Sequence, residues 1–176
     1  MAIDDHDLYY GTALKQIADH KLFKSINAEW QANKKSRCAY RINMDIGVYI
    51  RAATKPVNGE YVFNFKKENT DEMTALEGLC KKGVFVVLVC YNAKAISKGA
   101  RGAQYRQICV LRPSQISALI KTRGAGIPAD AQHNILITVP HSKSMRARIT
   151  IPGREGGRME LTRKIPRNAF PNLIFK

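Results

Sequence analysis

Hydrophobic and polar residues alternate with two different periods along the chain. Residues 8–21 carry apolar positions at helical spacing, with Tyr10, Leu14 and Ile17 on one face. From Cys38 to residue 53 the period falls to two, which is typical of a strand. Residues 84–91 form an unbroken apolar run, as in strands that are covered on both faces. The pattern therefore predicts a chain that mixes helices with strands.

Turn and capping residues divide these patterned segments. Asn58-Gly59 is a strong turn signal, so we expect residues 46–66 to form a hairpin. Asn69 and Glu72 have the spacing of a capping box that begins a helix. The expected elements are a helix over 8–21, an irregular polar segment over 22–36, one long or bent strand over 38–53, a strand over 60–65, a helix over 69–80, a strand over 84–91, a loop over 92–104, a strand over 105–111, a helix over 114–121 and antiparallel strands over 134–139, 145–151 and 159–164.

This order of elements predicts an α/β (or α+β) fold. We expect a mixed central β-sheet flanked by helices, with an αβββαβ-like core followed by C-terminal antiparallel strands. The 176 residues suit a single domain, and no repeat or low-complexity linker divides them. Within it, residues 1–91 would form the core, residues 92–176 a basic extension on the same sheet, and the apolar tail 165–176 would pack back onto the body.

Charge is the outlying property of the composition. The net charge is +15, and its distribution is uneven: residues 1–90 carry 13 Lys and Arg against 11 Asp and Glu, whereas residues 91–176 carry 16 against 3. A positive field of this kind attracts phosphates and speeds encounter with them. Nucleic acid is therefore the leading candidate partner. An acidic protein, an anionic membrane surface and a merely soluble basic surface are the alternatives.

Several classes of site and of location are disfavoured by the sequence. It has no phosphate-binding P-loop, no dinucleotide fingerprint, no zinc-protease motif and no hydrolase nucleophile elbow. The four histidines lack metal-ligand spacing, so zinc is not expected. The four cysteines form no C-x-x-C pair and are expected to be reduced and buried. The acidic N-terminus, the absence of a spanning apolar run and the lack of a long basic amphipathic helix predict a cytoplasmic protein without a membrane partner.

Two residues on the predicted hairpin suggest a known chemistry. Asp45 stands at the start of one strand, and Lys66 ends the next in Phe63-Asn64-Phe65-Lys66. Together with the order of elements, they resemble the core of the PD-(D/E)xK nucleases, the restriction-endonuclease-like family. In that family, carboxylates on adjacent strands converge on Mg²⁺, which polarises the scissile phosphate. The resemblance implies a divergent Mg²⁺-dependent endonuclease.

The same resemblance assigns roles to residues. It implies Asp45 as a metal ligand, Lys66 as the stabiliser of developing charge, and Glu60 as the second carboxylate and metal ligand. Glu72 or Glu77 of the following helix is an alternative second carboxylate. Asn64 stands where the family has an acidic residue, and this departure favours a non-catalytic binding module on the same scaffold. Both hypotheses stay open at the level of sequence.

The second half of the chain predicts a binding surface that needs no catalysis. Arg146 and Arg148 share one strand face, and arginine can bond phosphate at two points. The expected phosphate contacts are Arg101, Arg106, Arg123, Lys143, Arg146, Arg148, Arg154 and Arg158. Aromatic residues are sparse in this half, which favours backbone contacts to duplex DNA over base stacking. RNA, and a protein-interaction module with an acidic partner, are the alternatives.

Overall fold

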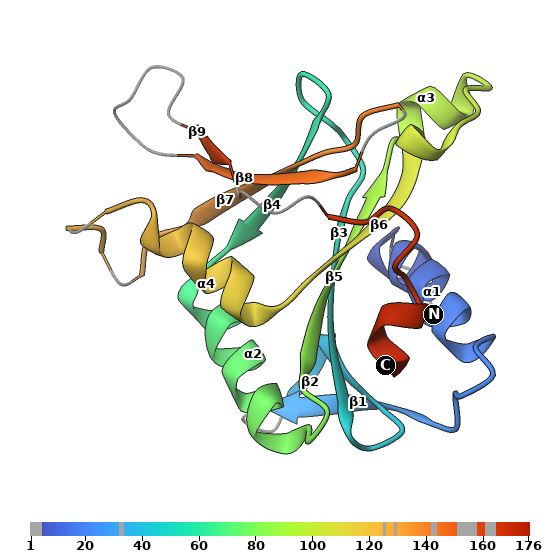
Figure 1. Cartoon of the computed structure of the whole chain (residues 1–176), viewed down its shortest axis with the longest axis vertical. Helices are drawn as coiled ribbons and strands as arrows, with labels where there is room; N and C mark the ends of the chain where they lie inside the picture. The colour runs from blue at the N-terminus through green and yellow to red at the C-terminus, as the bar shows by residue number, and fades with distance from the viewer. Residues whose placement is uncertain are drawn as a thin grey trace.

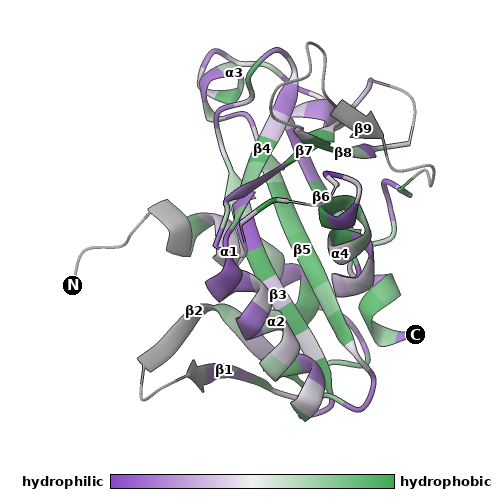
Figure 2. Ribbon diagram, turned by 90° about the vertical axis from the view of Figure 1, so that its left-hand side faces the viewer, coloured by the Kyte–Doolittle hydropathy of each residue, from purple (hydrophilic) through white to green (hydrophobic). Residues whose placement is uncertain are grey.

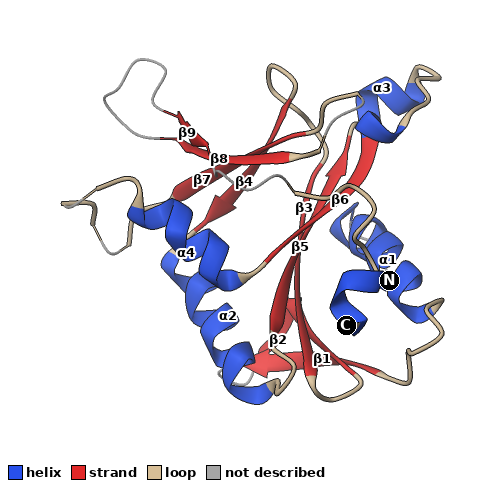
Figure 3. Cartoon of the chain, in the orientation of Figure 1, coloured by secondary structure: helices blue, strands red, loops and turns tan. Residues whose placement is uncertain are grey.

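Helices are interspersed among runs of strands along the chain (Figures 1 and 3). The computed structural model describes residues 5–31, 34–124, 126–128, 130–141, 144–150, 158–160 and 165–176. The elements are α1 (Asp5–Ala18), β1 (Ile26–Gln31), β2 (Lys34–Ile42), β3 (Ile46–Ala53), β4 (Glu60–Phe65), α2 (Lys67–Leu79), β5 (Val84–Tyr91), α3 (Ala93–Ser97), a 3₁₀ turn (Ala103–Tyr105), β6 (Arg106–Leu111), α4 (Pro113–Lys121), β7 (His133–Thr138), β8 (Arg146–Thr150), β9 (Arg158–Glu160) and a second 3₁₀ turn (Asn172–Phe175).

The strands form two sheets. The central sheet has five strands in the order β1-β2-β3-β5-β6, and the second sheet has four in the order β4-β7-β8-β9. In the central sheet β3 and β5 are parallel and the other neighbours are antiparallel, so the sheet is mixed. The second sheet is antiparallel throughout. The predicted α/β class, with a mixed central sheet flanked by helices, is confirmed.

An apolar layer covers each face of the central sheet. One layer joins β3, β5 and β6 to α1 and to the C-terminal tail, where Ile174 is buried, so the prediction that the tail packs back is confirmed. The other layer joins the same strands to α2, α4 and the second sheet. β5 lies between them and is buried from Val84 to Cys90, which confirms the prediction of a strand covered on both faces (Figure 2).

The first hairpin of the central sheet differs from the expectation. Residues 22–36 were expected to be irregular, but they contain β1 and the start of β2. The segment 38–53 is not one long or bent strand, because a turn at 43–45 divides it into the antiparallel pair β2 and β3. Asn43 and Met44 adopt positive φ angles of 52° and 68° there, and asparagine tolerates that region better than most residues. The Asn43 side chain also accepts hydrogen bonds from the backbone N–H groups of Lys24 and Ser25.

The expected hairpin over residues 46–66 is wrong. β3 is hydrogen-bonded to β2 on one edge, over Ile46–Tyr49, and to β5 on the other edge, and β4 is not among its partners. β4 instead pairs with β7 in the second sheet. The Asn58-Gly59 turn closes only an isolated bridge between Val57 and Glu60. Consequently β3, which follows Asp45, and β4, which precedes Lys66, belong to different sheets.

The remaining elements follow the expectation closely, with local additions. The loop 92–104 contains the short helix α3 and most of a 3₁₀ turn. All four cysteines are free, as predicted, and Cys80, Cys90 and Cys109 are buried, whereas Cys38 is only half-buried. Burial raises the pKa of the Cys80 thiol to about 11. No helix in the described part of the chain is both long enough and apolar enough to span a bilayer.

Candidate nucleic-acid interface

Two connections meet at the carboxyl end of the parallel strand pair, the loop from β3 to β4 and the segment from β5 to β6. β3 ends at Ala53 opposite Cys90 of β5, and β6 runs antiparallel to β5 and so begins at the same edge. Ala93 N donates to Thr54 O at 3.3 Å and joins the two connections, while Asn92 N donates to Tyr105 O at 2.9 Å within the second. Loops at the carboxyl ends of parallel strands are the usual place for ligand contacts in α/β sheets.

Five exposed cations project from these loops and from the first residue of β6, and we call them the basic edge. They are Lys55, Lys94, Lys98, Arg101 and Arg106. The segments that carry them, 54–59 and 92–107, contain no aspartate or glutamate. Among the described residues none of the five forms an ion pair. Their charges are therefore available to an external anion.

The lysines of the basic edge surround a hollow. Lys55, Lys94 and Lys98 line a space of about 460 Å³ together with Pro56, Asn92 and Ala95. The polypeptide approaches this hollow from two loops that are far apart in sequence, joined by the Ala93–Thr54 hydrogen bond. An anion at this position would contact cations from both loops at once.

The arginines predicted on β8 lie where the pattern placed them. Burial alternates along β8, so that Ala147 and Ile149 face the core while Arg146 and Arg148 lie half-buried on the outer face of the second sheet. Arg148 Nη1 lies 3.7 Å from Glu60 Oε1. This ion pair neutralises part of the charge on that face, so the face is less available to phosphate than the basic edge.

Of the four other predicted phosphate contacts, the structure describes the side chain of Arg123 alone. Arg123 turns inward: its Nη1 donates to the Gln132 carbonyl at 3.1 Å and to His133 Nδ1 at 2.6 Å. It therefore serves as an internal hydrogen-bond donor. Lys143 and Arg154 lie outside the described residues, and only the backbone of Arg158 is described, in β9 opposite Thr150.

The structure does not bring Asp45, Lys66 and Glu60 together. The Asp45 carbonyl accepts from Lys82 N, which follows α2, while Lys66 caps the opposite end of that helix. The 13 residues of α2 separate the two by about 20 Å. Glu60 begins β4 and Lys66 follows its end, and the six residues of that strand again span about 20 Å.

Each of the three candidate catalytic residues has a local role. Asp45 Oδ2 lies 3.4 Å from Lys82 Nζ, and the buried Glu60 accepts a hydrogen bond from Thr138 Oγ1 at 3.2 Å. Lys66 is exposed at the start of α2, where its N–H donates to Asn69 Oδ1. Within the described residues, no group of three or more His, Cys, Asp or Glu side chains could hold a metal ion. This arrangement gives no support to a shared Mg²⁺ site.

Sequence reasoning missed the lysines of the basic edge as site residues. Lys94 and Lys98 follow the most clearly predicted strand, and the rule that ligands bind at carboxyl ends would have singled them out. Applying it requires knowing that β3 and β5 are parallel neighbours, which no local pattern showed. His133, the buried partner of Arg123, carried no sequence signal at all.

Comparisons with known proteins add no assignment to this geometry. No protein-family model, curated protein or solved structure matches the chain.

Proposed function

We propose that the protein binds nucleic acid, with duplex DNA favoured, by contacting the phosphate backbone through the basic edge. The observation that carries this proposal is the set of five exposed cations on two segments, 54–59 and 92–107, that contain no acidic residue. Contacts from Lys and Arg to phosphates supply most of the affinity of sequence-independent binding. The net charge of +15 adds a long-range attraction toward the same partner.

The surface favours a duplex over a single strand. Proteins that hold single strands stack bases on accessible aromatic rings. Among the residues whose exposure the structure describes, the large exposed apolar side chains are Leu8, Leu22, Ile26, Met44, Val57 and Leu79, and none is aromatic. Tyr105, beside the basic edge, is half-buried. Backbone contact with little base readout is the mode that these side chains support.

Catalysis is not part of this proposal. A phosphodiesterase site of the expected kind needs two carboxylates on one metal ion, and Asp45 and Glu60 lie in separate parts of the fold. Incubation with plasmid and Mg²⁺ tests this directly. Cleavage that is lost in Asp45→Ala would contradict the proposal and restore the nuclease hypothesis.

A charge-matched pair of double variants tests the binding surface. Lys55→Ala/Lys98→Ala removes two cations of the basic edge, whereas Lys24→Ala/Lys81→Ala removes two exposed cations at the opposite edge, beside the starts of β3 and β5. Fluorescence anisotropy with duplex DNA and duplex RNA measures both. We expect the basic-edge pair to weaken binding by roughly tenfold and to reduce the slope of log K against log salt by about 2, because each phosphate contact contributes about 0.9.

Three outcomes would overturn the proposal. Equal losses in the two double variants would assign binding to net charge rather than to the basic edge. Failure of the unmodified protein to bind either duplex would remove nucleic acid as the partner. Binding with little dependence on salt would favour a protein partner instead.

A further inference from the structure

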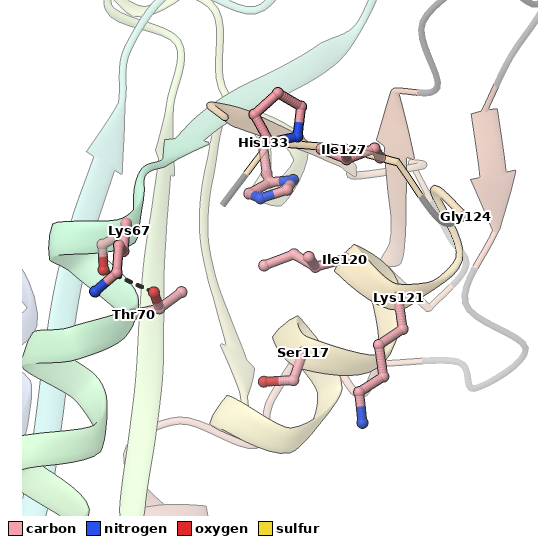
Figure 4. A pocket seen from close by; sticks show the side chains of 9 residues that line it. Lys67, Thr70, Ser117, Ile120, Lys121, Gly124, Ile127 and His133 are labelled. Carbon is pink, nitrogen blue, oxygen red and sulfur yellow. Dashed lines mark hydrogen bonds between the residues drawn. The ribbon is translucent and has the colours of Figure 1, made fainter. Parts of the chain in front are cut away.

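Two hollows lie on opposite faces of the central sheet. One, of about 410 Å³, lies between α2 and α4 (Figure 4). Ile120 stands there between His133 and Ser117, and the side chain of Lys121 runs away from His133, so these polar groups cannot hold one ligand together. The other, of about 350 Å³, lies on the face that α1 and the C-terminal tail cover, and its volume is within the range of small-ligand sites. We call it the α1 hollow.

The α1 hollow lies at the same end of the sheet as the basic edge. β5 lines it with its last residues and β6 with its first residues, at the carboxyl end of the parallel strand pair. Val89 and Ile108 of these strands belong to the apolar layer beneath α1. Tyr91 and Arg106 lie two residues nearer the end of the sheet, and side chains alternate along a strand, so both point to the same face. Arg106 is therefore shared between the α1 hollow and the basic edge.

The ring of Tyr91 offers the α1 hollow a surface for stacking. Tyr91 and Arg106 are register partners on neighbouring strands, so their Cβ atoms lie about 5 Å apart. The Tyr91 side chain is half-buried, and the ring of Tyr9 contacts it with 5.0 Å between the centroids and 46° between the planes. This contact restricts the Tyr91 ring. An aromatic ring beside an arginine suits a ligand that is planar and carries a negative charge.

Polar groups of α1 complete the lining. Thr12 and Gln16 both line the α1 hollow, and they lie one helical turn apart at exposed positions. Thr12 Oγ1 donates to the Leu8 carbonyl at 3.1 Å, so toward a ligand it serves as an acceptor. The Gln16 amide can both donate and accept. None of the described residues that line the hollow is an aspartate or a glutamate.

The three kinds of contact together select a nucleotide. Inorganic phosphate would use the cation alone, and an aliphatic ligand would leave the polar groups without partners. A nucleotide offers a base for the ring, donors and acceptors on the base edge for α1, and a phosphate for Arg106. The bases of an intact duplex stay inside the stack, so only an unpaired nucleotide can enter a hollow.

We propose that the α1 hollow receives one unpaired nucleotide at the end of a duplex whose backbone lies on the basic edge. The base stacks on Tyr91 and bonds to Thr12 and Gln16, while the phosphate contacts Arg106. This assignment rests on the proposed function, because the basic edge brings the strand end to the hollow. One ring holds one base, in keeping with a surface that otherwise contacts the backbone.

Fluorescence anisotropy with three matched duplexes tests the site. The first is blunt, the second carries one unpaired nucleotide at a strand end, and the third carries an abasic residue in place of that nucleotide. The abasic end has the same phosphate but no base. We expect the unpaired nucleotide to be bound roughly tenfold more tightly than the abasic residue, because stacking on an aromatic ring requires the base. Overhangs at the 5′ and the 3′ end are measured separately, and this preference at either end supports the proposal.

Substitutions of tyrosine identify the ring. Tyr91→Leu removes it and should abolish the preference for the unpaired nucleotide over the abasic residue, whereas Tyr91→Phe keeps a ring and should retain the preference. Tyr105→Leu is the matched control, because Tyr105 is also half-buried beside the basic edge but does not line the α1 hollow. It should retain the preference.

Substitutions at two exposed threonines test the hollow without disturbing the core. Thr12 and Thr74 both lie within helices, and each donates to the carbonyl four residues earlier. Thr12→Glu adds a carboxylate to the lining, where it repels the phosphate of the nucleotide, and it should remove most of the preference. Thr74→Glu makes the same change of charge on α2, on the other side of the sheet, and should leave the preference unchanged.

The outcomes separate this site from the basic edge. Circular dichroism and thermal unfolding verify that each variant folds. If the blunt duplex binds but unpaired and abasic ends bind equally, the α1 hollow has no such role and the backbone contact stands. A preference that survives in both Tyr91→Leu and Thr12→Glu would place the base elsewhere and overturn the assignment. If none of the three duplexes binds, the basic-edge proposal fails and this inference fails with it.

Discussion

At the scale of single residues, His133 is the clearest case of a side chain whose chemistry is set by its surroundings. Its pKa is lowered from the usual 6.5 because burial disfavours the charged ring and because Arg123 repels it. In the unfolded chain neither influence acts, so the unfolded state takes up the proton first as the pH falls. The stability that depends on neutral His133 is therefore present above pH 6.5 and decreases below it.

This linkage predicts a pH dependence that one substitution removes. The free energy of unfolding should fall between about pH 7 and pH 5, where an unperturbed histidine titrates. His133→Asn cannot titrate and retains the acceptor for Arg123, so its stability should fall less over the same interval. Urea unfolding of both proteins across the interval measures the difference. Parallel curves for the two proteins would show that His133 titrates alike in both states.

The roles of individual charged residues could be predicted only in part. Arg101 and Arg106 lie exposed at the basic edge as expected, and Arg146 and Arg148 share the outer face of β8. Arg123 is half-buried rather than fully exposed, because His133 offers it an acceptor ten residues later. A sequence shows that an arginine is present, but its direction depends on acceptors supplied by other elements. For the same reason, the sequence did not predict the ion pair of Asp45 with Lys82, because it depends on how the turn at 43–45 lies against the segment after α2.

At the scale of elements, the close approach of α2 to β3 depends on Gly47. A Cβ atom at this position would lie 2.7 Å from Val84 Cγ2 and 2.9 Å from Leu76 Cγ, both of which are buried. These side chains belong to the layer between the central sheet and α2, where neighbours cannot move freely. The glycine thus fixes how tightly the helix packs on the strand.

Glycine-to-alanine substitutions in β3 and in α2 should change the free energy of unfolding in opposite directions. Gly47→Ala should destabilise the protein by about 1–3 kcal/mol, the usual cost of overpacking a core. Gly78→Ala lies in α2 with no atom within 4 Å of its added Cβ, and it should stabilise by about 0.5–1 kcal/mol because alanine favours the helix. Urea unfolding gives both values. A neutral Gly47→Ala would mean that α2 can shift away from β3.

The existence of the elements was largely predictable, whereas their pairing was not. The apolar run at 84–91 predicted β5 with the bounds that the structure has, and the helix predicted over 114–121 is α4, which begins one residue earlier at Pro113. The hairpin prediction failed because turn chemistry at Asn58-Gly59 is a local signal, while the partner of β3 is set by competition for its two edges. β5 pairs with the second edge of β3, and the crossover between these parallel strands contains β4 and α2. Pairing between strands this far apart in sequence produces no local sequence pattern that could predict it.

At the scale of the whole molecule, the positive charge has two separate effects on a nucleic acid: long-range attraction by all exposed cations, and direct contact by those of the basic edge. The net charge of +15 acts over the Debye length, about 30 Å at 0.01 M salt and about 8 Å at 0.15 M. At low salt, every exposed cation therefore steers a polyanion toward the protein, wherever the cation lies. The cations of the basic edge differ from the other exposed cations only in the bound complex, because they alone would contact the phosphates. Association and dissociation rates thus report on different properties of the same charge.

Stopped-flow kinetics with duplex DNA should resolve the two contributions. At about 0.01 M salt, where the field extends across the molecule, we expect Lys55→Ala/Lys98→Ala and Lys24→Ala/Lys81→Ala to slow association by similar factors. At about 0.15 M salt, the second pair should recover the unmodified rate because screening hides distant charges. Only the basic-edge pair should raise the dissociation rate, by roughly tenfold, since affinity differences among variants of one interface lie mostly in dissociation. If the Lys24/Lys81 pair raised the dissociation rate as much, the duplex would contact the opposite edge of the central sheet, and the basic edge would lose its assigned role.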